Sequence, residues 1–376
     1  MPQDAHNAER PDASPATTDG AGPPRVVAWE ITRSCNLACV HCRASAVHGP
    51  YQGELSTDEA FTLVDQIASF ASPILILTGG EPLLRADVFD IAARAVERGL
   101  RVVMSPNGTL VTPAAARRMK DVGIARISVS IDFPTAAEHD LFRGVPGAFD
   151  GALRGIGNAL DAGVEVQINS TITKANVRHL SALLELAERV GAVSFHPFML
   201  VPTGRGKDLR DQELAPEEYE RALEWMFDAQ QSSTLFLKPT DVPHYWRVMR
   251  QRAKAGDTKI AAHPHAHGGM DTLSRGCLAG LGFCFVSHVG RVQPCGYFDV
   301  AAGDVRRATF YDIWRESPLF QRLRDFSQLK GKCGACEFKQ VCGGCRARAY
   351  EATGDYMAEE PYCAYVPKGW CAPAGT

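Results

Sequence analysis

Residues 35–42 read CNLACVHC and place Cys35, Cys39 and Cys42 in the spacing C-x₃-C-x₂-C. The segment follows an apolar run, Val26 to Thr32, that is typical of a buried strand. Three thiolates this close can bind three irons of a cubane iron–sulfur cluster, which leaves the fourth iron open to a substrate or co-substrate. The spacing also fits a structural zinc or iron–sulfur site that takes its last ligand from elsewhere in the chain.

The composition argues against several classes of protein. The chain has 376 residues, 45% of them hydrophobic, and a formal net charge of −3, so we expect neither nucleic-acid binding nor a membrane span. No basic segment followed by an apolar one opens the chain, which argues against secretion. Twelve cysteines then favour metal or redox chemistry in a reducing compartment, and we expect a cytoplasmic protein.

The uneven distribution of cysteine predicts the domain organisation. Three cysteines lie at 35–42 and nine at 277–371, which indicates two metal-bearing regions joined by a cysteine-free scaffold. We predict four parts: a disordered tail at 1–24, an α/β barrel at 25–240, a helical linker at 241–273 and a small cysteine-rich domain at 274–376.

Residues 25–202 alternate strand patterns with helix patterns, which predicts parallel βαβ units. The predicted strands are Val26–Thr32, Ile74–Leu77, Arg101–Ser105, Arg126–Ile131, Glu165–Thr171 and Val193–Val201. The predicted helices lie near 57–70, 87–98, 113–122, 147–161 and 176–190. Six repeats favour a partial (β/α)6 barrel of the TIM type, although an open doubly wound sheet fits the pattern as well. Either architecture gathers its active groups at the carboxyl ends of the strands.

Polar residues mark the ends of these strands. The second strand ends in a turn with a carboxylate, the third in an amide, and the fourth and fifth carry polar groups with a period of two: Gly79, Gly80, Glu81, Asn107, Ser128, Ser130, Asp132, Gln167 and Asn169. Any one of these is most often a satisfied core polar group, but a buried parallel strand normally carries Val or Ile at such positions. Their convergence on strand ends therefore predicts a site.

Together these motifs resemble the radical S-adenosylmethionine (SAM) superfamily. The resemblance implies that Cys35, Cys39 and Cys42 bind a [4Fe-4S] cluster whose open iron chelates SAM. It further implies SAM contacts from the following residues: Gly79, Gly80, Glu81, Asn107, Ser130, Asp132, Arg143 and Asn169. His41 stands where many members carry an aromatic residue, and an imidazole can stack on adenine in the same way.

The C-terminal cysteines form a second pattern, which a pair of zinc ribbons would also fit. After a radical SAM core it resembles the SPASM domain, a carrier of one or two auxiliary [4Fe-4S] clusters, and eight cysteines favour two. By this resemblance one cluster is held by Cys277, Cys284, Cys295 and Cys345, and the other by Cys333, Cys336, Cys342 and Cys363. Cys371 is left without a role.

Longer stretches resemble the heme b synthase family of the siroheme-dependent heme pathway. They are WEITR at 29–33, FRGVPGAF at 142–149, VPTGRG at 201–206, RGCL at 275–278 and QPCGY at 293–297. The resemblance implies conversion of two propionates of iron-coproporphyrin III to vinyl groups. A deoxyadenosyl radical would remove a hydrogen from the propionate β-carbon, CO₂ would leave, and an auxiliary cluster would accept the remaining electron. It implies an iron-porphyrin substrate and a low-potential donor such as a flavodoxin or ferredoxin.

A tetracarboxylate substrate requires cationic partners, because guanidinium and ammonium groups pair with carboxylates. The candidates are Arg43 beside the cluster loop, and Arg205 and Lys207 after the sixth strand. A solvated charged surface is the commoner explanation for any one of them.

Three alternatives remain at this point. The chain could modify another tetrapyrrole, of the heme d1 or didecarboxysiroheme type. It could be a SPASM peptide or protein maturase, although only a short tail precedes the barrel. It could also be a non-enzymatic zinc or iron–sulfur scaffold, which would leave the turn at Gly79–Glu81 and the polar strand faces unexplained.

Overall fold

The structure, a computed structural model, describes residues 22–256 and 275–371. Most of the predicted tail and the second half of the predicted linker lie outside these residues. None of the helices in the described part is both long and apolar enough to cross a membrane.

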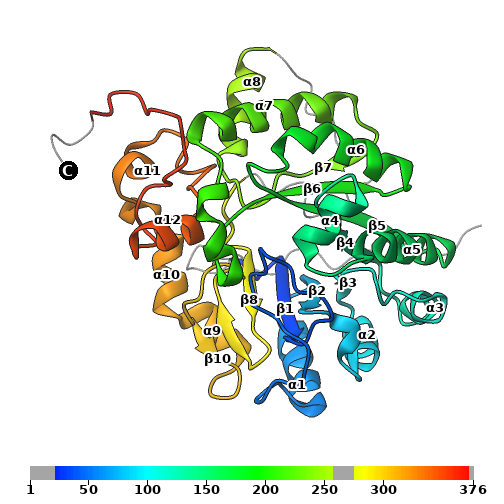
Figure 1. Cartoon of the computed structure of the whole chain (residues 1–376). Helices are drawn as coiled ribbons and strands as arrows, with labels where there is room; N and C mark the ends of the chain where they lie inside the picture. Colours follow the sequence, from blue (N-terminus) through cyan, green and yellow to red (C-terminus); the bar gives the residue numbers. More distant parts are fainter. Residues whose placement is uncertain (1–21, 257–274, 372–376) are drawn as a thin grey trace, which may run out of the picture.

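Seven parallel strands form the barrel sheet in the order of the chain (Figure 1). They are β1 Val26–Thr32, β2 Ile74–Gly79, β3 Arg101–Met104, β4 Arg126–Ser130, β5 Glu165–Ile172, β6 Ser194–Met199 and β7 Phe236–Leu237. The six predicted strands are confirmed to within two residues at each end. The partial barrel is confirmed as well, with the short β7 added at its edge.

Helices connect the strands and cover one face of the sheet (Figure 1). They are α1 Thr57–Ala68, α2 Val88–Glu97, α3 Pro113–Asp121, α4 Ala136–Arg143, α5 Ala148–Asp161, α6 Leu180–Arg189, α7 Pro216–Ser232 and α8 Tyr245–Lys254. The sequence patterns missed α4, because this short helix buries only His139, Phe142 and Arg143 and so has no apolar stripe. Its beginning is nevertheless marked, since the Thr135 hydroxyl accepts a hydrogen bond from the Glu138 amide.

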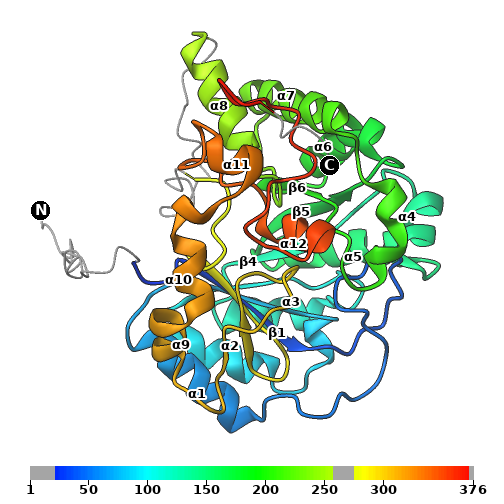
Figure 2. The same cartoon turned by 90° about the vertical axis from the view of Figure 1, so that its left-hand side faces the viewer.

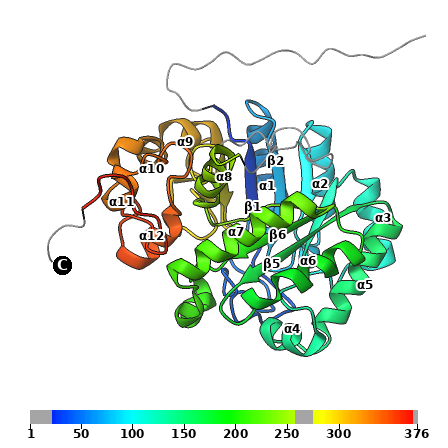
Figure 3. The same ribbon diagram turned by 90° about the horizontal axis from the view of Figure 1, so that it is seen from above.

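The C-terminal region continues the barrel sheet instead of forming a separate body. Its strands are β8 Phe283–Val286, β9 Arg291–Gln293 and β10 Gly303–Asp304, and its helices are α9 Phe310–Glu316, α10 Pro318–Arg324, α11 Gly331–Ala335 and α12 Arg346–Thr353. Strand β8 pairs in parallel with β1, on the side opposite β2. The sheet therefore has ten strands, and α9 to α12 lie together at one side of the barrel (Figures 2 and 3).

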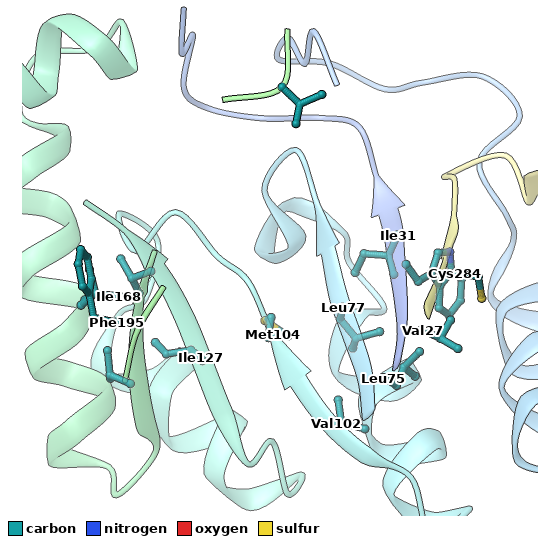
Figure 4. Packing of buried hydrophobic residues seen from close by; sticks show 14 of the residues in the cluster. Val27, Ile31, Leu75, Leu77, Val102, Met104, Ile127, Ile168, Phe195 and Cys284 are labelled. Carbon is teal, nitrogen blue, oxygen red and sulfur yellow. The ribbon is translucent and has the colours of Figure 1, made fainter. Parts of the chain in front are cut away.

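The two faces of the sheet differ in chemistry, because successive side chains on a strand point to opposite faces. One face carries Val27, Leu75, Met104, Ile127 and Phe195 and packs with the helices in the apolar core (Figure 4). The opposite face carries the barrel's polar strand residues, including Glu30, Ser128, Ser130, Gln167, Asn169 and His196. The polar residues that recur with a period of two on β4 and β5 therefore share the face opposite the apolar core.

Arg348 on α12 links the C-terminal domain to the barrel through hydrogen bonds and ion pairs. Its guanidinium is 1% exposed and donates hydrogen bonds to the carbonyls of Leu200 and Asp241, at 3.0 and 3.1 Å. It also lies 3.5 Å from the buried carboxylates of Glu213 and Glu360. Burial raises the pKa of Glu213, and the positive charge of Arg348 opposes that shift.

We predict that Arg348→Met lowers the free energy of unfolding by about 3–5 kcal/mol, because it leaves two carboxylates buried without their cation. Arg210→Met is the control, since Arg210 is 56% exposed and lies 3.6 Å from Glu351, and it should change stability by less than about 0.5 kcal/mol. Urea unfolding measures both. Equal stabilities of the two variants would contradict the role given to Arg348.

Candidate active site and iron–sulfur sites

The loop after β1 carries the three closely spaced cysteines and is held by backbone contacts from two other elements. The amides of Ala38 and Val40 donate to the carbonyls of Arg143 and Phe142 at the end of α4, at 3.1 and 3.0 Å. Arg205 binds the loop from the opposite part of the chain, with its Nε 2.8 Å from the Cys39 carbonyl. The loop conformation therefore depends on residues more than a hundred positions away.

The three thiols in this loop have the surroundings of cluster ligands. The Leu37 amide donates to Cys35 Sγ and the Ala46 amide to Cys42 Sγ, both at 3.4 Å. Arg143 Nη1 lies 3.7 Å from Cys39 Sγ. Burial, with added repulsion from the neighbouring thiolates, raises the pKa of Cys35 to about 11. A thiolate there needs a cationic partner, and the irons of a cluster provide one.

The turn after β2 approaches this loop too closely for a side chain. A Cβ at Gly80 would lie 2.3 Å from the carbonyl oxygen of Ser34, and one at Gly79 would lie 2.3 Å from that of Thr32. The Glu81 amide donates to the Ser34 carbonyl at 2.7 Å. Glycine is therefore required here by close packing against the start of the cysteine loop.

Glu81 has a buried carboxylate in this turn. It accepts hydrogen bonds from the amides of Leu83 and Asn107, at 3.0 and 2.7 Å. Burial raises its pKa to about 7, although the two amides act in the opposite direction. The group can therefore be neutral or charged near neutral pH, and a nearby cation would favour the charged form.

Asp132 and Arg143 form a buried ion pair beside the cysteine loop. Arg143 Nη2 lies 2.5 Å from Asp132 Oδ2, and the Thr171 amide donates to Asp132 Oδ1 at 2.7 Å. Burial raises the pKa of Asp132, but the Arg143 charge outweighs it and the pKa is lowered. Both residues were predicted as SAM contacts, and the structure places both at the site.

The remaining predicted SAM contacts lie on neighbouring strand ends. Ser130 pairs in register with Asn169 on the polar face of the sheet. Asn107 hydrogen-bonds to Asn36 in the cysteine loop at 2.7 Å. His41 in the same loop stacks on Phe142, with ring centroids 4.3 Å apart. The structure therefore brings the predicted residues to one end of the barrel.

The predicted substrate cations make contacts within the protein. Arg43 Nη2 lies 2.6 Å from Glu30, and Arg205 Nη1 donates to the Ala46 carbonyl at 2.8 Å. Lys207 is exposed and lies 3.6 Å from Glu351. Arg43 and Arg205 thus position the cysteine loop, and binding of substrate by any of the three stays a prediction.

Four C-terminal cysteines line one cavity, as the assignment to a common cluster requires: Cys333, Cys336, Cys342 and Cys363. The amides of Glu360, Phe338 and Gly344 donate to three of their sulfurs at 3.3 to 3.4 Å. Arg247 and Lys332 line the same cavity and bring positive charge to the thiolates. Cys371 is exposed.

The other predicted set is only partly assembled. Cys277, Cys295 and Cys345 lie close enough for their charges to interact, and burial raises the pKa of Cys345 to about 12. Cys284, predicted as the fourth member, is not brought to them. It lies on β8 beside Val27 of β1 and therefore faces the apolar core, opposite the barrel interior.

Sequence reasoning missed two buried acids at these sites. Glu30 pairs with Arg33, Arg43 and His288. It is the only carboxylate in an otherwise uncharged strand, and this feature of the sequence could have identified it. Asp241 follows β7 and interacts with Cys295, and nothing in its local sequence distinguishes it. In residues 22–256 and 275–371, no three His, Cys, Asp or Glu side chains meet closely enough to hold a single metal ion.

The fold and the site define a radical SAM enzyme with a C-terminal iron–sulfur domain. The radical SAM superfamily profile matches residues 29–187, and the profile of an iron–sulfur cluster-binding domain, SPASM, matches residues 277–345. The cofactors of this class are SAM, the [4Fe-4S] cluster that binds it and auxiliary iron–sulfur clusters. The SAM-bound structure of SuiB from Streptococcus suis superposes with a TM-score of 0.72 over 92% of this chain and 78% of that one, at 16% identity.

Similarity to proteins of known activity extends over nearly the whole chain. The AdoMet-dependent heme synthase of Nitratidesulfovibrio vulgaris is 53% identical over 93% of this chain and 95% of its own length. The protein of the same name from Methanosarcina barkeri is 51% identical over 92% of this chain and 97% of its own. The chain therefore belongs to the radical SAM superfamily, and within it to the family of these heme synthases.

We predict that Gly80→Ala removes iron from the SAM-binding site, because the new Cβ forces the turn away from the Ser34 carbonyl. Reconstituted variant should hold about four fewer irons per chain and bind SAM weakly. Gly157→Ala is the matched control, since nothing lies within 4 Å of a Cβ at that position in α5. It should keep all its iron and gain about 0.4–1 kcal/mol of stability. Wild-type iron content and SAM affinity in Gly80→Ala would refute the prediction.

Proposed function

We propose that the protein is a heme synthase that converts two propionates of iron-coproporphyrin III to vinyl groups and so forms heme b. The observation that carries this proposal is the 53% identity to a heme synthase, which covers the barrel and the C-terminal domain alike. The reaction balances when each propionate loses one hydrogen atom from its β-carbon, one CO₂ and one electron. A low-potential donor such as a flavodoxin or ferredoxin in the cytoplasm would supply the electron that starts each round.

In this proposal Cys35, Cys39 and Cys42 hold the cluster that binds SAM. When bound at these residues, the cluster and SAM would supply a 5′-deoxyadenosyl radical for removal of the hydrogen atom. Gly79, Gly80 and Glu81 meet the SAM amine with backbone oxygens and a carboxylate. The imidazole of His41 stacks on Phe142 and would stack on the adenine of SAM as well.

The polar face of the barrel completes the proposed SAM site. Ser130, Asn169 and Asn107 offer hydroxyl and amide groups to the ribose and the methionine carboxylate. Arg143 brings a positive charge close to that carboxylate, while Asp132 holds the guanidinium in place at 2.5 Å. An auxiliary iron–sulfur cluster held by the C-terminal cysteines would accept the remaining electron.

The test is an anaerobic assay of reconstituted protein with iron-coproporphyrin III, SAM and a low-potential reductant. We expect heme b, identified by its mass and absorption spectrum, together with 5′-deoxyadenosine. The Cys35→Ala variant, which lacks one cluster ligand, should form neither. SAM cleavage by the wild type without porphyrin binding or heme formation would overturn the proposal and favour the peptide-maturase alternative.

We also predict that SAM binding strengthens as pH rises through about 7, because the pKa of Glu81 is raised to about 7 and only its charged form attracts a cation. Glu81→Gln should weaken binding roughly 30-fold, about 2 kcal/mol, and remove this part of the pH dependence. Isothermal titration between about pH 6 and pH 8 compares the two proteins. Their difference isolates Glu81 from the titration of SAM itself, and parallel profiles would contradict the assignment.

The raised pKa of Glu81 also affects stability, but a rise in pH weakens stability whereas it strengthens SAM binding. Glu81 binds its proton more tightly in the folded protein than in the unfolded chain, where the pKa of its carboxyl group is 4.5. The contribution of Glu81 to the free energy of unfolding is therefore fully present below pH 4.5 and is lost as pH rises through about 7.

A further inference from the structure

Cys284 lies on a face of β8 that points away from the barrel interior. The pairing of β8 with β1 places Cys284 beside Val27, and neighbouring positions in a sheet share a face. Both side chains are fully buried in the apolar core (Figure 4). Phe285, the next residue, must then point to the opposite face, where its ring lies 4.5 Å from the Arg43 guanidinium.

Cys295 lies on the opposite side of the same strand. The carbonyl of Gly296 accepts a hydrogen bond from Arg43 at 3.2 Å, and a Cβ at Gly296 would lie 3.3 Å from the Phe285 ring. The segment that carries Cys295 therefore packs on the Phe285 face of β8. Cys284 could reach the same cluster only if β8 turned over, which would expose its buried face and break its register with β1.

Asp241 lies among the segments that carry the other three cysteines. Its carboxylate is hydrogen-bonded to the Tyr297 side chain, and the Tyr297 amide donates to Cys295 Sγ at 3.3 Å. Its carbonyl accepts from Arg348, whose own amide donates to Cys345 Sγ at 3.4 Å.

The segment that carries Cys277 also packs against the residues that follow Asp241. A Cβ at Gly276 would lie 2.6 Å from the carbonyl oxygen of Pro243, two residues after Asp241. Asp241 thus touches, or lies next to, residues that neighbour all three cysteines. It belongs to the segment after β7 and not to the C-terminal domain.

Asp241 has two features that are unusual for a buried carboxylate. Its Oδ2 is buried and has no hydrogen-bond partner, which is costly for a carboxylate oxygen unless an ion occupies the remaining direction. Its backbone has φ +59°, a conformation that is strained for a residue other than glycine and is typical of functional sites. Carboxylate oxygens are established ligands of iron in proteins.

We propose that Cys277, Cys295, Cys345 and the carboxylate of Asp241 hold the first auxiliary cluster, and that Cys284 is a core residue. The proposal rests on the iron–sulfur domain and is independent of the porphyrin substrate. A harder ligand in place of one thiolate raises the reduction potential of a cluster, as histidine does in Rieske centres. The cluster then accepts an electron more readily than one held by four thiolates.

The test uses the full chain with Cys35, Cys39 and Cys42 replaced by Ala, so that only the auxiliary sites hold iron. Into this background we would introduce Cys284→Ala, Cys284→Val, Asp241→Ala and Asp241→Cys. Asp208→Ala is the control, since Asp208 is an exposed aspartate on the barrel. Each reconstituted protein is analysed for iron and sulfide, for its reduced EPR spectrum and for its reduction potentials, and circular dichroism checks the fold.

We expect both Cys284 variants and Asp208→Ala to match the background in iron content and EPR spectrum. Asp241→Ala should change the spectrum of one cluster or lose about four irons per chain. Asp241→Cys should retain the iron, with a shifted spectrum and a lower potential for that cluster.

Two outcomes would overturn the proposal. One is an unchanged spectrum and potential in both Asp241 variants. The other is the loss of one cluster from a folded Cys284→Val protein, because that side chain fills the core and lacks only the thiol. Neither readout involves porphyrin, so failure here leaves the heme synthase assay unaffected.

Discussion

The buried ion pair between Asp132 and Arg143 is the interaction on which the SAM site depends. Asp132 lies two residues after β4 and is fixed by the Thr171 amide of β5, so its position is set by the sheet. Arg143 ends α4, and its guanidinium reaches Cys39 Sγ while its carbonyl receives the Ala38 amide. One pair therefore joins two strands, a helix and the cluster loop. A buried charge pair of this kind is costly to assemble, and it is most valuable where position matters more than stability.

The barrel could be predicted from the sequence because each of its strands and helices has its own local pattern of apolar and polar residues. The six strands alternate with helices that begin at capping residues. The hydroxyls of Ser56 before α1 and of Thr112 before α3 accept hydrogen bonds from the amides of Glu59 and Ala115. Helix α4 was missed because two of its three buried residues, His139 and Arg143, are polar, and Arg143 lies beside the cysteine loop. Local patterns describe packing, and they fail where function replaces apolar residues.

The C-terminal region shows the limit of motif spacing more clearly. The resemblance to the SPASM domain assigned Cys333, Cys336, Cys342 and Cys363 to one cluster, and these four residues line one cavity. Motif spacing could not place Cys284, because the face on which a strand residue lies depends on register with a partner strand. The partner strand of β8 is β1, which lies more than two hundred residues earlier in the chain. No local sequence pattern predicts that these two strands pair. The position of Asp241 could not be predicted for the same reason, because only the fold brings it close to Cys295 and Cys345.

Arg43 shows how the two parts of the molecule act as one. It follows Cys42 directly, and its guanidinium joins Glu30 inside the barrel to the Gly296 carbonyl beside Cys295. The pKa of Glu30 is lowered, since Arg43, His288 and Arg33 together outweigh the effect of burial, so the pair stays charged. The cysteine loop and the segment of Cys295 thus share one half-buried arginine. Because the strands that precede both segments belong to one continuous sheet, a change at Arg43 acts on the loop after β1 and on the segment after β9 at the same time.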